Sequence, residues 1–85
     1  MDHFQKSHEM LTSGIKKMFE DLERKHREPE HQGVLATLRE SVHNFCESKV
    51  PTTHDELVKL TQAHTMKMMA IEHTASIIRR QKMWN

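Results

Sequence analysis

Cysteine, proline and glycine are scarce in this sequence of 85 residues, and tyrosine is missing altogether. Cys46 is the only cysteine, so no disulfide can form within the chain, and a lone thiol suits a reducing compartment. No apolar run approaches the roughly 18 residues of a membrane span. The N-terminal residues MDHFQKSHE lack the basic flank and apolar core of a signal peptide. We therefore expect a cytoplasmic protein that contacts no membrane.

Residues that favour helices are abundant instead. Leu, Met, Lys, Glu and Gln are common, whereas two glycines and two prolines leave few turns, so helix is favoured over sheet. Thirteen basic residues against twelve acidic ones give no overall signature of a polyanion-binding protein. We expect residues 1–85 to form a single helical domain. A domain this small buries only about 60–65% of the surface that its unfolded chain exposes, so it is marginally stable alone.

Two prolines divide the chain into three predicted helices. Pro29 disfavours helical geometry at the preceding residue and suits the first turn of a new helix, so the first two helices are either separate or one kinked helix. Pro51 ends the second helix, and Thr53 with Glu56 has the form of a capping box. A short connection there makes the second and third helices antiparallel neighbours. The helices are expected at about residues 3–27, 29–48 and 54–82.

Each predicted helix carries one apolar seam whose members are spaced by three and four residues, which is typical of a buried helix face. Histidines occupy some seam positions, and His8 and His64 have two alternatives: each is partly exposed with its ring packed sideways, or at least one of them is buried. The three seams are Phe4, His8, Leu11, Ile15, Met18 and Leu22; His31, Leu35, Leu38, Val42 and Phe45; and Leu57, Leu60, His64, Met68, Ile71, Ala75 and Ile78.

The third helix has a second apolar row that one core does not need. This row starts after about residue 65, where a third helix of about 29 residues should extend beyond the second helix. Exposed apolar surface of this kind usually marks an interface, and a second copy of the chain is the simplest partner. We therefore expect a homodimer or higher oligomer whose interface contains Met66, Met69, Ala70, Ile77 and Trp84.

Eight histidines suggest a metal site, but no two are three or four residues apart, as ligands on one helix face should be. The best cluster is Glu40, His43, Cys46 and Glu47 on the second helix, and it has no second half elsewhere in the chain. Cys46 with His43 could form a thiolate pair, but no cleft or oxyanion hole accompanies it. We expect no metal, no cofactor and no enzymatic activity.

Two basic clusters near the ends of the first and third helices offer an alternative function. Cations at these places complement the helix dipoles, which needs no ligand. They could also bind a nucleic acid or a nucleotide, with Trp84 as a stacking group. The residues of these clusters are Arg24, Lys25, Arg27, Arg79, Arg80 and Lys82.

The sequence thus predicts an all-α fold of three helices, dominated by an antiparallel helical hairpin with a long C-terminal helix, that assembles as an oligomeric helical bundle. The predicted function is a small non-enzymatic protein-binding module, a self-associating adaptor, regulator or inhibitor whose partners are itself and another protein. Proteins of this size are often phage or mobile-element accessory proteins. The alternative is binding of nucleic acid or nucleotide through the basic helix ends of an oligomer.

Overall fold

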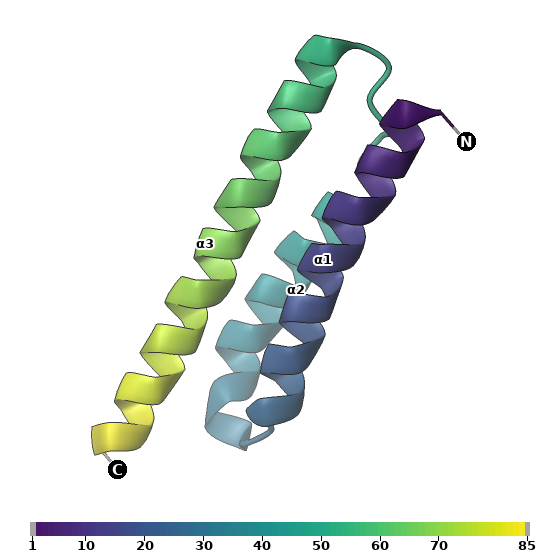
Figure 1. Ribbon diagram of the computed structural model, residues 1–85. Helices are drawn as coiled ribbons and strands as arrows, with labels where there is room; N and C mark the ends of the chain where they lie inside the picture. The colour runs from purple at the N-terminus through teal and green to yellow at the C-terminus, as the bar shows by residue number, and fades with distance from the viewer. Residues whose placement is uncertain (1, 85) are drawn as a thin grey trace.

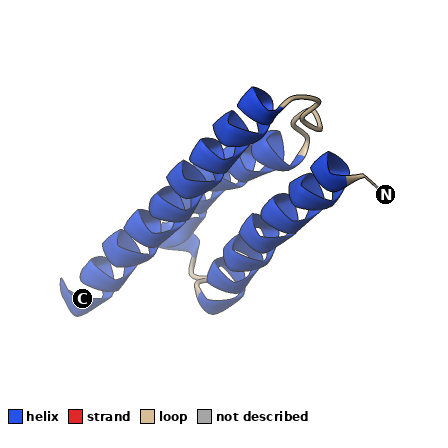
Figure 2. Ribbon diagram, turned by 45° about the horizontal axis from the view of Figure 1, so that its top comes forward, coloured by secondary structure: helices blue, strands red, loops and turns tan. Residues whose placement is uncertain are grey.

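Three α-helices and no strand make up residues 2–84, which the computed structural model describes together with the side chains of residues 2–81. α1 (His3–Lys25) and α3 (His54–Trp84) run in one direction, and α2 (Gln32–Cys46) lies between them in sequence and runs in the opposite direction (Figure 1). Every pair of helices is in contact, in a body of 49 × 17 × 15 Å. Short connections join the helices at the two ends of the bundle (Figure 2). No helix in the described part is long and apolar enough to cross a bilayer.

The first connection explains why α1 and α2 are two separate helices. α1 begins with Asp2 as its N-cap, whose Oδ1 accepts the Gln5 N–H at 2.8 Å. It ends at Lys25, two residues before the expected end. Glu28 precedes a proline and is extended, with φ −62° and ψ 141°, so the chain must leave the helix before it. A 3₁₀ turn, η1 (Pro29–His31), then takes the place of the expected first turn of α2.

The second connection ends in a modified capping box at the start of α3. Thr53 Oγ1 accepts the Glu56 N–H at 3.1 Å, as predicted. The Glu56 carboxylate accepts the Thr52 N–H at 3.3 Å and also the Thr52 hydroxyl, so the return bond is displaced by one residue. Asp55 and Glu56 lie in the first turn, where negative charge complements the helix dipole.

The three predicted seams meet in one core. The buried apolar side chains are Ile15, Phe19, Leu22, Leu35, Leu38, Val42, Phe45, Leu60, Ile71 and Ile78. Ile71 and Ile78 are only 4% and 0% exposed, so the other helices cover α3 well past its middle. His26, just after α1, lines one groove together with Arg79 of α3. The expectation that α3 extends beyond its partners after about residue 65 is therefore wrong.

Histidines form part of this interior. His8 is buried, which agrees with the second of the two alternatives for the seam histidines, and its Nε2 donates to the Ser48 carbonyl oxygen at 2.9 Å. His64 is partly buried, with its ring centroid 6.4 Å from that of Phe45. His31 is 1% exposed, and neither of its ring nitrogens has a hydrogen-bond partner among the described residues. Its only ring neighbour among them is His26, which it meets edge-on at 6.1 Å.

A buried imidazole without hydrogen bonds lowers the free energy of unfolding. We therefore expect His31→Leu to raise the free energy of unfolding by about 1–3 kcal/mol, measured by urea denaturation followed by circular dichroism. His43→Leu is the matched control, because His43 is exposed on α2, and its effect should stay within about 0.5 kcal/mol. Destabilisation by His31→Leu beyond that of the control would contradict this account of the core.

Candidate functional site

The outer face of α3, turned away from α1 and α2, exposes large apolar side chains. Met66 and Met69 are 67% and 63% exposed, and Val58 is 42% exposed. Residues three, four or eight positions apart lie on the same side of a helix, so these three side chains form one surface. A single exposed apolar residue is ordinary on a protein surface, whereas an aligned set is typical of an interface.

The residues expected at the interface have different positions in the structure. Met66 and Met69 are exposed on the outer face, and Ile77 is partly buried. Ala70 packs against the core cluster, so it belongs in part to the interior. The side chain of Trp84 lies outside the described residues. Met66 and Met69 are therefore the centre of the candidate surface.

Sequence reasoning missed Val58, which belongs to the same face. The sequence predicts that the second apolar row begins after residue 65, where α3 would lose its partners. The structure shows that these residues are exposed because they lie on the outward side of α3. The length of α3 relative to its neighbours is not the reason. Steps of four residues from Met66 through Gln62 to Val58 were the signal that could have found it.

The basic clusters at the ends of α1 and α3 lie at the same end of the bundle (Figure 1). Lys25 and Arg79 line one groove of about 220 Å³, together with Asp21 and Glu72. The Asp21 carboxylate pairs with Arg24 at 2.7 Å and with Lys25 at 3.0 Å. These hydrogen bonds lower the pKa of Asp21. Much of the positive charge at this end is therefore neutralised within the chain.

The other basic residues whose side chains are described lie in different places. Arg27 and Arg24 line a groove of about 500 Å³ between α1 and α2, which also contains Glu20 and Glu23. Arg80 is exposed on α3. The side chain of Lys82 falls outside the described part of the chain.

A second groove between α1 and α2, of about 230 Å³, contains three of the four residues considered as metal ligands, His43, Cys46 and Glu47. Glu40 is exposed and does not line it. Burial raises the pKa of the Cys46 thiol, and its Sγ donates to the Thr12 carbonyl oxygen at 3.6 Å. A neutral thiol is a poor nucleophile and a poor metal ligand.

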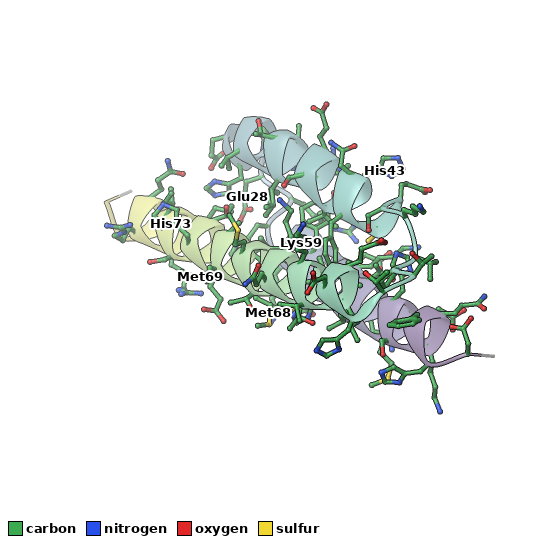
Figure 3. The ribbon with its side chains drawn as sticks, turned by 90° about the horizontal axis from the view of Figure 1, so that it is seen from above. Glu28, His43, Lys59, Met68, Met69 and His73 are labelled. Carbon is green, nitrogen blue, oxygen red and sulfur yellow. The ribbon has the colours of Figure 1, made fainter. Side chains whose placement is uncertain are left out.

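No three His, Cys, Asp or Glu side chains in the described part of the chain are placed to hold a metal ion together. Figure 3 shows two of the histidines on different helices, His43 on α2 and His73 towards the far end of α3.

Arg39 lines the groove of about 230 Å³ that also contains His43 and Cys46. The sequence did not identify it as a residue of any site. Its Nε donates to Glu23 Oε2 at 2.8 Å, its Nη2 donates to the same oxygen, and its Cζ lies 6.0 Å from the centroid of the Phe19 ring. The two charged residues are 16 positions apart on different helices, so no local spacing could reveal the pair. Arg39 therefore covers the core beneath it and joins α2 to α1.

Comparison with known proteins finds no match to a protein-family model, to a curated protein or to a solved structure.

Because thiolates and not thiols react with alkylating reagents, we expect Cys46 to react slowly with iodoacetamide at neutral pH in the folded protein. Unfolding in urea should accelerate the reaction, since it removes the burial that raises the thiol pKa. Mass spectrometry of the alkylated fraction over time measures both rates, and Cys46→Ser is the unlabelled control. Equal rates in the folded and unfolded states would mean that the thiol is accessible and has an ordinary pKa.

Proposed function

We propose that this chain is a small non-enzymatic protein-binding module that associates with itself, as an adaptor, regulator or inhibitor does. The exposure of Met66 and Met69 carries the proposal, because both lie on a helix face that no other described element covers. Methionine suits a binding surface, since its side chain is flexible and polarizable. In this proposal the antiparallel hairpin of α2 and α3 presents the surface, and the assembly is a cytoplasmic, homo-oligomeric helical bundle.

The apolar face is large enough to support weak association. Fully burying a Met, Val or Ile side chain is worth about 1.5–3 kcal/mol. Association costs an estimated 4–15 kcal/mol in lost freedom of motion. Each subunit contributes Val58, Met66, Met69 and Ile77, and the two methionines begin about two-thirds exposed. Eight such side chains in a dimer can therefore offset the cost of association.

The side chains that line the grooves support a binding protein in preference to an enzyme. The groove of about 500 Å³ is lined by charged side chains of both signs, and the neighbouring groove contains the Arg39–Glu23 ion pair. Burial raises the pKa of Cys46, which is the one cysteine of the sequence. Catalytic sites instead combine a reactive group with an adjacent base and a place for the substrate.

We expect Met69→Glu combined with Ile77→Glu to dissociate the assembly while most of the helix content remains, because the charges fall on the outer face of α3. Light scattering at about 50 μM and circular dichroism measure the two effects. Met10→Glu is the matched control, since Met10 is 68% exposed on α1 and lines the groove between α1 and the start of α3 instead of this face. Leu60→Glu should unfold the chain, because Leu60 is 8% exposed in the core. A wild type that stays monomeric up to about 500 μM would refute self-association.

The second candidate function is binding of a nucleic acid or nucleotide, and the meeting of Lys25 and Arg79 in one groove favours it. Lys25→Glu with Arg79→Glu should then weaken binding of a single-stranded oligonucleotide, and the logarithm of affinity should fall linearly with that of salt concentration. Fluorescence anisotropy measures both, with Lys16→Glu on another groove as control. If the apolar face carries the function, we expect no oligonucleotide binding at physiological salt.

A further inference from the structure

The outer face of α3 has the same spacing of residues in both directions along the helix. We define the outer stripe as eight residues whose positions differ by 3, 4, 4, 3, 4, 4 and 3. At 3.6 residues per turn, these seven turns drift by only about 20°, so the stripe runs nearly parallel to the helix axis for about 37 Å. The outer stripe consists of Asp55, Val58, Gln62, Met66, Met69, His73, Ile77 and Arg80.

The chemistry of the outer stripe is also symmetric about its midpoint, which lies between residues 67 and 68. Residues at equal distances from this midpoint are alike or complementary: two methionines, two polar side chains, two branched aliphatic side chains, and an acid with a base. The pairs are Met66 with Met69, Gln62 with His73, Val58 with Ile77, and Asp55 with Arg80. If a second α3 lies alongside in the opposite direction, each residue of the stripe therefore meets the residue with which it is paired here.

We propose that the outer stripe binds the outer stripe of a second copy of this chain in antiparallel orientation, about a two-fold axis that passes between residues 67 and 68. The inference rests on the proposed function and specifies its partner and register. The two-fold operation places each Asp55 beside the partner's Arg80 and each Met66 beside the partner's Met69. A parallel arrangement would place like charges together at both ends, which is destabilising.

The described contacts leave the outer stripe open for this use. Asp55 and Arg80 are exposed, and neither makes an ion pair among the described residues. Arg24 and Arg39, by contrast, each pair with an acidic residue of α1. The ends of the outer stripe thus carry unpaired charges of opposite sign. Figure 3 labels two members of the outer stripe on α3, Met69 and His73.

Symmetry distinguishes a second copy from any other partner. A different protein requires a surface that complements the outer stripe, but it does not require the stripe to complement itself. A contact along one helix is small beside the roughly 1,200–2,000 Å² of a stable interface. The dimer is therefore weak, and its population depends on protein concentration.

Exchange of the terminal charges tests the register. Asp55→Arg and Arg80→Asp should each raise the dissociation constant about five- to tenfold, since each places like charges together at both ends. An equimolar mixture of the two variants should recover the wild-type dissociation constant as a heterodimer, and so should the variant that carries both changes. Sedimentation equilibrium from about 10 to about 500 μM measures the constants. Arg79→Asp, one position off the stripe, is the control and should not pair preferentially with Asp55→Arg.

Cross-linking tests the orientation. In a Cys46→Ser background, Asp55→Cys mixed with Arg80→Cys should form a heterodimer with a short thiol-reactive cross-linker. Asp55→Cys alone should not, because the two introduced thiols would lie about 37 Å apart at opposite ends of the contact. Cross-linking of Asp55→Cys to itself would establish a parallel pairing and overturn the proposal.

The outcomes separate this inference from the proposed function. If Met69→Glu with Ile77→Glu dissociates the assembly while both single charge variants assemble like the wild type, self-association stands and the antiparallel register is overturned. If the wild type is monomeric at every concentration, both fall. Weakening of each single variant without recovery on mixing also overturns the register. Circular dichroism of every variant shows whether the helices are intact.

Discussion

A single row of buried side chains is the constraint on which this structure depends. Ile15, Leu35 and Ile78 are at most 1% exposed, and one of them comes from each helix. A body only 17 × 15 Å across has room for one such row with a helix on each of three sides. Every helix must therefore keep an outer face in contact with its surroundings, and folding alone does not decide which residues occupy that face.

The outer faces of the three helices differ in chemical character, and packing of the core does not require this difference. The surface shared by α1 and α2 carries charges that pair across the helices, such as Arg39 with Glu23. The outer face of α3 instead carries Met66 and Met69 between two unpaired charges. Exposed methionines do not stabilise the monomer, since burial is the source of their contribution. This contrast makes the outer face of α3 the surface best suited to binding a partner.

Local spacing predicted the core well, because burial in a helix recurs every three or four residues and needs no knowledge of distant contacts. The seams found Leu38, Leu60 and Ile71 in this way. Spacing could not predict how far each helix is shifted along its neighbours. The prediction that α3 loses its contacts with α1 and α2 after about residue 65 was therefore wrong. Contacts such as His8 with Ser48, which are 40 positions apart, depend on that same alignment. The order of the outer stripe is present in the sequence, but only the fold shows which side of α3 faces outward.

An odd number of helices has a mechanical consequence. α1 begins and α3 ends at opposite ends of the 49 Å body (Figure 1). Tension applied through the two ends of the chain would therefore act along the helix axes. α1 and α3, which run in the same direction and are in contact, would have to slide past each other with all of their interlocked ridges moving together. In an antiparallel dimer, the same tension would act in opposite directions in the two subunits.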